Sequence, residues 1–409
     1  MGVAAFPRWS DASPGGKRVA AIVTHYIHNS HAEIIAGRLL ESHTLDGKGS
    51  WPKQGWPRLE LASLYVDQFP PADKSRRLAA EHGVRICDSV TDALTLGGPD
   101  LAVDGVMIIA EHGDYPLSDT GQILYPRRKF FEEAVAVFRR SGRVVPVFMD
   151  KHLAWNWPDA KWIYDTAREM KVPLMAGSTV PLTWRHPAIE MERGAPATGA
   201  LVLSFGPLET YGFHGLEGLQ CLAERRRGGE TGVASVQCLE GDAVWRARED
   251  GRIDGALVDA CLARREDARP RKKRMEDEVK ATAFLIDYRD GFRAVMLHGN
   301  GGGFINWIAA WRESGREDLP ATLFWTQEAR PLGHFGFLVQ GIEQMIFTGK
   351  PTWPVERTLL TTGILAAGFQ SRQEGGERID TPHLAISYQP TFTWTDPVPP
   401  PPSRPFPGP

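Results

Sequence analysis

The run VVPVFMDKHL, which spans Val144–Leu153, decides the fold and marks a candidate site. Its apolar, β-branched first half is typical of a short strand buried in a parallel sheet. Asp150, Lys151 and His152 follow directly. Ligands of open α/β sheets bind in the crevice beyond the carboxyl ends of the strands, so these side chains stand where a site is expected. A solvent-exposed strand-to-helix loop is the simpler alternative.

Strands and helices alternate on both sides of this run. The pattern predicts strands at residues 19–24, 59–66, 84–86, 103–110 and 172–176, and helices at residues 32–40, 72–82, 92–96, 127–140 and 159–170. Repeated β-α alternation is typical of a doubly wound parallel sheet with helices on both faces. We therefore expect a Rossmann-like domain over residues 18–185, after an irregular leader at residues 1–17.

The second half of the chain has a different pattern, in which strands follow one another. Strands are predicted at residues 200–206, 233–239, 242–246, 282–288, 292–298 and 321–326, and helices around residues 216–222 and at 332–348 and 355–372. Asp290-Gly291 between two strands predicts a tight hairpin. We expect an α/β domain with a mainly antiparallel open sheet over residues 186–392, and a proline-rich tail at residues 393–409.

Composition places the chain among ordinary globular proteins. Of its 409 residues, 42% are hydrophobic and 24% are charged, and the formal net charge is -3. This charge gives no basis for binding nucleic acid or an anionic membrane, and no apolar run is long enough to span a bilayer. The four cysteines form no CxxC pair, so neither a disulfide framework nor a thiolate zinc site is expected. We expect a cytoplasmic enzyme with a small-molecule substrate.

The turn after the first strand, Thr24–His31, contains no glycine. A strand, a tight turn and a helix open a dinucleotide-binding unit, whose turn uses glycines to approach a pyrophosphate. Here His25, His28 and His31 stand at i, i+3 and i+6 instead. The positive N-terminus of the helix is retained, so Thr24, His25 and His28 are still candidates for holding the anion of a cofactor.

Two further polar groups follow predicted strands. Asp67 ends the second strand, where an acid can accept hydrogen bonds from a ribose, although a turn or cap residue is an equal alternative. Glu111, His112, Asp114 and Tyr115 follow the strand at residues 103–110. The carboxyl ends of parallel strands meet at one edge of a sheet, so we expect these groups to converge on the same crevice as Lys151.

A fourth group comes from the second half of the chain. Glu209, Tyr211, His214 and Glu217 follow a predicted strand and open a helix that could close over the crevice. Ligand sites are common at such domain junctions. Trp184 and Arg185 stand near the junction itself and are candidates for contacting a substrate.

Two chemistries fit these residues. In the first, Lys151 holds or polarises the oxygen of a carbonyl or alcohol, and His214 exchanges its proton. In the second, histidines and carboxylates bind a divalent metal ion, with His25, His28 and His31 as ligands of zinc, manganese or iron. No HExxH-type motif accompanies the three histidines, and each alone is more often a structural residue than a ligand.

The chain resembles the Gfo/Idh/MocA family of sugar and polyol oxidoreductases. Four stretches carry the resemblance: Leu64–Asp67 followed by Ala79–Gly83; Asp150–Leu153, where the family usually has Glu-Lys-Pro; Gly212–His214; and the helices at 332–348, ending in Gly349-Lys350, and at 355–372. Three features depart from the family. The His-rich turn replaces the glycine-rich loop, His152 replaces proline, and Thr210 replaces an aspartate.

The resemblance implies a Rossmann domain followed by an α/β domain, whose open sheet face forms a homo-oligomer. It also implies NAD- or NADP-dependent oxidation or reduction at a sugar or cyclitol carbon. Lys151 and His214 match the active-site residues of the family, and Asp150 and His152 flank the lysine. A metal-dependent hydrolase or lyase is the alternative. A catalytically inactive binding protein is a third possibility, which the presence of both Lys151 and His214 disfavours.

These expectations assign a role to each candidate residue. The catalytic candidates are Lys151, His214, Asp150 and His152; the cofactor-binding candidates are Thr24, His25, His28, Asp67 and Glu111; the substrate-binding candidates are His112, Asp114, Tyr115, Trp184, Arg185 and Tyr211; and the metal ligands of the alternative are His25, His28 and His31.

Overall fold

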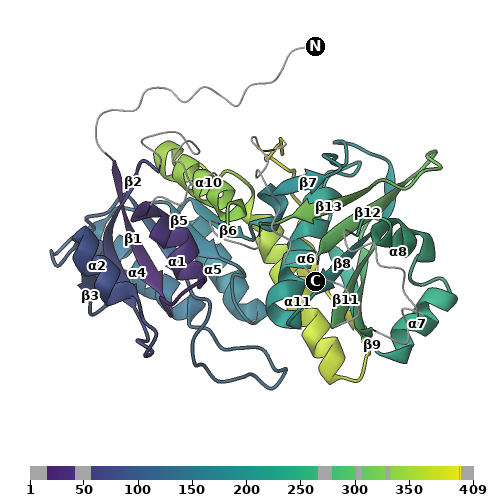
Figure 1. Cartoon of the computed structure of the whole chain (residues 1–409), viewed down its shortest axis with the longest axis horizontal. Helices are drawn as coiled ribbons and strands as arrows, with labels where there is room; N and C mark the ends of the chain where they lie inside the picture. Colours follow the sequence, from purple (N-terminus) through teal and green to yellow (C-terminus); the bar gives the residue numbers. More distant parts are fainter. Residues whose placement is uncertain are drawn as a thin grey trace, which may run out of the picture.

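The computed structural model describes residues 16–41, 57–265, 279–300, 306–327, 332–395 and 397. Two sheets with their helices lie side by side, one built mainly from the first half of the chain and one from the second (Figure 1). Most of the expected leader and of the proline-rich tail falls outside the described residues. Among the described residues, no helix is long and apolar enough to cross a membrane.

The first sheet is entirely parallel. Its strands lie in the order β3-β2-β1-β4-β5-β6. They are β1 (Lys17–Val23), β2 (Leu59–Val66), β3 (Arg85–Cys87), β4 (Gly105–Ile109), β5 (Val147–Asp150) and β6 (Leu174–Gly177). The order reverses between β1 and β4, which is the topological switch point of a dinucleotide-binding fold. The predicted Rossmann-like sheet is confirmed.

Helices bury both faces of this sheet. One face packs against α3 (Val90–Thr95), α4 (Arg127–Ser141) and α5 (Trp157–Glu169). The other packs against α1 (His31–Ile35), the following 3₁₀ turn (Ala36–Leu39), α2 (Ser75–His82) and α10 (His334–Thr348). Because successive strand residues point to opposite faces, two buried faces explain the continuous apolar runs of β1 and β4. Helix α10 therefore completes the first sheet from the second half of the chain.

The second sheet is mixed and mainly antiparallel, as predicted. Its order is β14-β9-β10-β11-β8-β12-β13-β7, and only the β8–β11 pair within it is parallel. The strands are β7 (Trp184–His186), β8 (Ala197–Phe205), β9 (Val233–Glu240), β10 (Lys280–Tyr288), β11 (Arg293–Asn300), β12 (Trp307–Glu313), β13 (Ala321–Trp325) and β14 (Arg378–Asp380). The expected hairpin joins β10 and β11, and Gly291 provides its positive φ of 87°.

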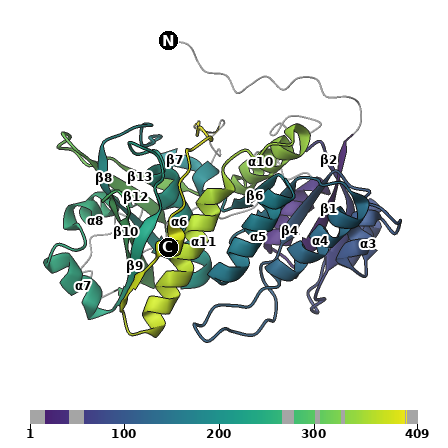
Figure 2. The same cartoon turned by 180° about the vertical axis from the view of Figure 1, so that it is seen from behind.

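Helices also cover both faces of the second sheet. On the inner face lie α6 (Leu208–Ala223) and α11 (Val355–Gln373), and on the outer face lie α7 (Asp242–Glu249) and α8 (Gly255–Leu262). Helix α11 contacts α6 and β9 as well as α5 and β6, so it joins the two sheets (Figure 2). The outer face, on which a partner copy was expected, packs against helices of the same chain.

The prediction of a strand at residues 242–246 was wrong. These residues begin α7, whose Val244, Trp245 and Ala247 pack against the sheet. Val244 and Ala247 are three residues apart, which is the spacing of one helix face. Alternation over five residues was too short a signal to separate a strand from a helix.

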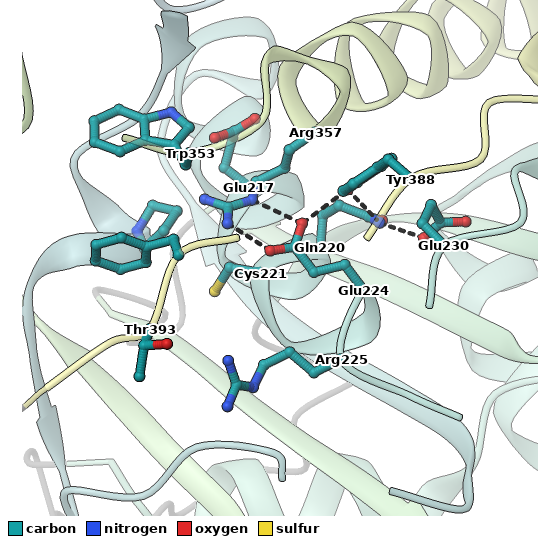
Figure 3. Close-up of polar contacts among 12 residues, drawn as sticks. Glu217, Gln220, Cys221, Glu224, Arg225, Glu230, Trp353, Arg357, Tyr388 and Thr393 are labelled. Carbon is teal, nitrogen blue, oxygen red and sulfur yellow. Dashed lines mark hydrogen bonds and ion pairs between the residues drawn. The ribbon is translucent and has the colours of Figure 1, made fainter. Parts of the chain in front are cut away.

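The segment after β14 returns along α6 and α11, where a buried polar network holds it (Figure 3). Arg357 Nε donates to Glu224 at 2.9 Å, and the Tyr388 hydroxyl donates to the same carboxylate at 2.8 Å. Gln220 Nε2 donates to the Tyr388 oxygen at 3.2 Å. Residues 388–394 thus form part of the packed structure rather than a loose tail.

Candidate active site

A buried cluster of charged groups lies at the carboxyl edge of the first sheet. Lys151 Nζ lies 2.8 Å from Glu111 Oε1, and Arg127 Nη2 lies 3.0 Å from Glu111 Oε2. Arg127 also donates to the Lys151 carbonyl at 2.9 Å. All three side chains are buried. Burial raises the pKa of Glu111, but the charges of Lys151, His31 and Arg127 outweigh this effect and hold its pKa below the ordinary value.

His31 reaches the same crevice from the start of α1. Its Nδ1 lies 2.6 Å from Asp150 Oδ2, at the end of β5. Its ring centroid lies 5.7 Å from that of His112 and 6.4 Å from that of His214. Burial, followed by the charge of His31, lowers the pKa of His112 to about 4, so His112 is neutral at physiological pH. The start of α1, the segment after β4 and helix α6 thus bring three imidazoles together.

His214 enters the crevice from α6. Its Nδ1 shares a 2.5 Å hydrogen bond with Ser178 Oγ, just beyond β6, and its ring lies 5.1 Å from the ring of Trp307. Burial lowers the pKa of His214 well below its ordinary value, and the charges of Lys151 and His31 add to this effect. A neutral imidazole held at one nitrogen can exchange a proton at the other.

His152 and Glu209 face one another beside this cluster. His152 Nε2 lies 3.8 Å from Glu209 Oε1, and neither nitrogen of His152 has a hydrogen-bond partner among the described residues. Burial raises the pKa of Glu209 to about 7, although the backbone N–H of Ile123 donates to its carboxylate. The peptide bond between Lys151 and His152 is cis, and His152 stands where the resembled family usually has proline.

The turn after β1 is closed by side chains of the protein itself. Thr24 Oγ1 donates to the Glu111 carbonyl at 2.8 Å. Asn29 has a φ of 60°, and its N–H donates at 2.7 Å to Glu33, a fully buried carboxylate that also pairs with Lys74. A bound pyrophosphate would have to accept a hydrogen bond from the Asn29 N–H, which already donates to Glu33. Its negative charge would also lie close to the buried carboxylate of Glu33. The turn does not fit a pyrophosphate in the way a glycine-rich loop does.

The three histidines of the metal alternative diverge. His25 is half-buried, His28 is exposed and lies 3.7 Å from Glu33, and His31 turns to Asp150. In the described part of the chain, no group of three or more His, Cys, Asp or Glu side chains is arranged to hold a metal ion.

Asp67, in contrast, fits a ribose. Its two oxygens accept hydrogen bonds from Tyr65 at 2.8 Å and from Tyr115 at 2.7 Å. A carboxylate has about four lone-pair sites, so each oxygen keeps one for a further donor. Asp67 borders a pocket of about 630 Å³ that Phe69 and Arg76 also line. This end of the sheet has room for the adenosine half of a dinucleotide.

The remaining substrate candidates are dispersed. Tyr211 lies at the crevice, where its ring stacks on Trp307 at 5.5 Å between centroids. Asp114 is exposed, and its backbone N–H binds Gln68. Trp184 packs on Phe337, and Arg185 pairs with Glu190 at 3.2 Å in the second sheet. Trp184 and Arg185 lie on β7, and both have structural partners outside that strand.

Sequence reasoning missed Arg127, Ser178 and Trp307. Arg127 is the first residue of α4, where a basic residue is ordinarily exposed and gives no signal. Ser178 directly follows β6, so the strand-end rule that selected Lys151 could have found it. Trp307 follows residues 301–305, which lie outside the described residues, and no predicted element included it.

The fold defines a class: a two-domain α/β protein with a parallel Rossmann-type sheet and a second, mainly antiparallel sheet. Solved structures of that class are similar over nearly their whole length. GenD2 of gentamicin A biosynthesis, solved in complex with NAD, shares 14% sequence identity; the match covers 92% of this chain and 99% of GenD2, with a TM-score of 0.56.

Inositol dehydrogenases show the same likeness. Scyllo-inositol dehydrogenase from Lactobacillus casei is 11% identical, with 90% and 98% of the two chains covered and a TM-score of 0.56. A putative myo-inositol dehydrogenase from Sinorhizobium meliloti 1021 is 13% identical, with 89% and 99% covered and a TM-score of 0.54. These are dehydrogenases of the type that the sequence resemblance predicted, and they establish the fold. No family model and no curated protein matches the sequence.

Proposed function

We propose that this chain is an oxidoreductase that acts at a hydroxyl-bearing carbon of a small sugar or cyclitol. The observation that supports the proposal best is that Lys151 and His214 lie close enough for the charge of Lys151 to lower the pKa of His214. Lys151 is fixed by Glu111 at 2.8 Å and His214 by Ser178 at 2.5 Å, so both side chains are held at the carboxyl ends of β5 and β6.

Oxidation of an alcohol needs a group that holds its oxygen and a base that takes its proton. The ammonium of Lys151 is the donor that would hold the oxygen. His214 is neutral and bonds Ser178 through Nδ1, so Nε2 would take the hydroxyl proton, or return it in the reverse direction. Burial of the crevice excludes water and strengthens both interactions. Asp150 would orient His31 beside them.

A nicotinamide dinucleotide is the proposed hydride partner, by analogy with GenD2, which was solved with NAD. Asp67 would hold its ribose, whereas the turn at Thr24–His31 does not fit its pyrophosphate. We therefore assign no step to the dinucleotide. The metal-dependent alternative has no support in the described structure, because its three histidines do not converge.

The test is to titrate the purified protein with NADH and NADPH by fluorescence, and then to assay NAD⁺ and NADP⁺ reduction with inositols and monosaccharides. Saturable enhancement of the fluorescence and turnover with at least one polyol are expected. Absence of dinucleotide binding together with absence of turnover would contradict the proposal. Elemental analysis of the same sample checks the metal alternative independently.

A further inference from the structure

A second set of buried polar atoms lies next to Lys151 and lacks partners. Arg127 uses Nη2 for Glu111 and for the Lys151 carbonyl, while its Nε and Nη1 have no hydrogen-bond partner among the described residues. The same holds for both nitrogens of His152. Arg127 and His152 are each only 1% exposed and Glu209 only 7%. Leaving buried donors unpaired is costly, so these atoms point to an occupant.

These atoms come from three elements that meet beside Lys151. Arg127 begins α4, His152 follows β5, and Glu209 lies in the first turn of α6. His152 Nε2 and Glu209 Oε1 are 3.8 Å apart, and the charge of Arg127 acts on both side chains. Arg127 also touches the backbone of Lys151. A small molecule bound at this subsite would therefore be long enough to place a hydroxyl group beside Lys151.

The charges of the subsite favour an anion. Lys151 and Arg127 share the single carboxylate of Glu111, which leaves one positive charge in excess among these three groups, while the neighbouring carboxylate of Asp150 faces His31. Burial keeps His152 neutral by lowering its pKa well below the ordinary value. Glu209 has a pKa of about 7, so at neutral pH it is protonated in about half of the molecules. A guanidinium with free N–H groups prefers a planar carboxylate.

We propose that Arg127, His152 and Glu209 form a carboxylate-binding subsite, and that the substrate is an acidic sugar or cyclitol, such as a uronic acid. Its carboxylate would bind Arg127 Nε and Nη1 while its reacting hydroxyl meets Lys151 and His214. This inference rests on the proposed function for the reaction and adds the class of substrate. A phosphate ester fits less well, because its second charge would exceed the one positive charge available beside Glu209.

The test compares D-glucuronate with D-glucose, which differ only in a carboxylate at C6, by isothermal titration calorimetry on the full chain. D-glucuronate is expected to bind about tenfold more tightly or better. Arg127→Lys keeps the charge but removes the guanidinium, and should abolish this preference. Arg128→Lys is the matched control, because Arg128 is the next residue on α4 and is partly exposed, where it pairs with Asp159.

A second variant excludes misfolding as an explanation. Glu209→Gln removes the competing carboxylate and should tighten D-glucuronate binding several-fold at pH 8, where Glu209 is mostly ionised in the wild type. An unfolded variant cannot gain affinity. Binding that is equal for the two sugars, or absent for both, would overturn the subsite.

The outcome also separates this inference from the proposed function. Reduction of NAD⁺ by a neutral polyol, unchanged in Arg127→Lys, would uphold the oxidoreductase and overturn the carboxylate subsite. Preferential binding of D-glucuronate without reduction of NAD⁺ or NADP⁺ by any tested sugar or cyclitol would uphold the subsite and contradict the oxidoreductase.

Discussion

Lys151 is the residue on which the proposed chemistry depends most directly. It is buried and shares Glu111 with Arg127, so its removal leaves Glu111 with one cation instead of two. We expect Lys151→Met to reduce turnover about 100-fold or more, because the oxygen of the substrate loses its cationic donor. Its apparent KM should change less than kcat.

The same variant should remain folded, with a modest loss of stability, since Arg127 still neutralises Glu111. Lys161→Met is a suitable control, because Lys161 is a half-exposed lysine on α5 that pairs only with Asp165 within its own helix. Full activity of Lys151→Met would show that Lys151 is structural.

A second prediction at the residue scale concerns the turn after β1, Thr24–His31. His25 and His28 stand in the turn where a dinucleotide-binding fold has the glycines that let a pyrophosphate approach the backbone. We expect the double variant His25→Gly/His28→Gly to bind NADH about tenfold more tightly than the wild type in fluorescence titrations. His383→Gly, an exposed change far along the chain, should leave the affinity unchanged. Unaltered affinity in the double variant would mean that this turn does not contact the phosphates.

The strand-end rule predicted part of the site from the sequence. It selected Asp150, Lys151 and Glu111 because they follow predicted apolar strands, and His214 because its group follows a predicted strand in the second half of the chain. The family resemblance then matched Lys151 and His214 to active-site residues. It could not select Arg127, which is buried beside Glu111. Glu111 is forty residues from Lys151 in the sequence but contacts it in the fold. Nor could it foresee that Asp114 faces solvent while its neighbour Tyr115 turns inward to Asp67.

At the scale of elements, α7 and α8 serve as a cover for the outer face of the second sheet. Val258 of α8 is fully buried in this contact. Val258→Asp should lower the free energy of unfolding by about 3 kcal/mol or more, because it buries an unpaired charge. Ala256→Asp, two residues earlier on the exposed side, should have little effect. Urea denaturation measures both, and equal midpoints would show that the cover contributes nothing to stability.

The elements that the sequence predicted are those with a long or unambiguous pattern. The limits of β2 at residues 59–66 were predicted to the residue, because an apolar strand is bounded there by a proline-containing loop and Asp67. Helix α8 was missed because its eight residues are apolar on more than one side and carry little periodicity. Strand β12 was missed because both of its faces are buried, which removes the alternation that identifies a strand.

For the whole molecule, pH is the most direct probe of the buried histidines. Burial lowers the pKa of five of them: His112, His152, His214, His298 and His334. Below the ordinary value of 6.5 the unfolded chain binds protons that the folded chain does not, so stability falls as the pH falls. The urea midpoint should therefore be lower at pH 5.5 than at pH 7.5.

The titration of Glu209 has the opposite effect on the pH dependence of stability. Its raised pKa of about 7 means that the folded state binds a proton between about pH 4.5 and 7 that the unfolded state lacks, so its contribution to stability declines as the pH rises. Glu209→Gln should therefore show a steeper loss of stability on acidification than the wild type. A midpoint that does not change with pH in either protein would contradict the assigned shifts.

Helix α10 also has a consequence for how the protein is made. The face of the first sheet that it covers carries Met107, Ile109 and Phe148, and this face is only partly covered, by α1 and α2, until residues 334–348 leave the ribosome. At about 5–20 residues per second, translation from residue 150 to residue 334 takes roughly 10 to 40 s. The nascent chain exposes part of that apolar surface throughout this interval, so we expect it to be more prone to aggregation than the finished molecule, whose core is buried.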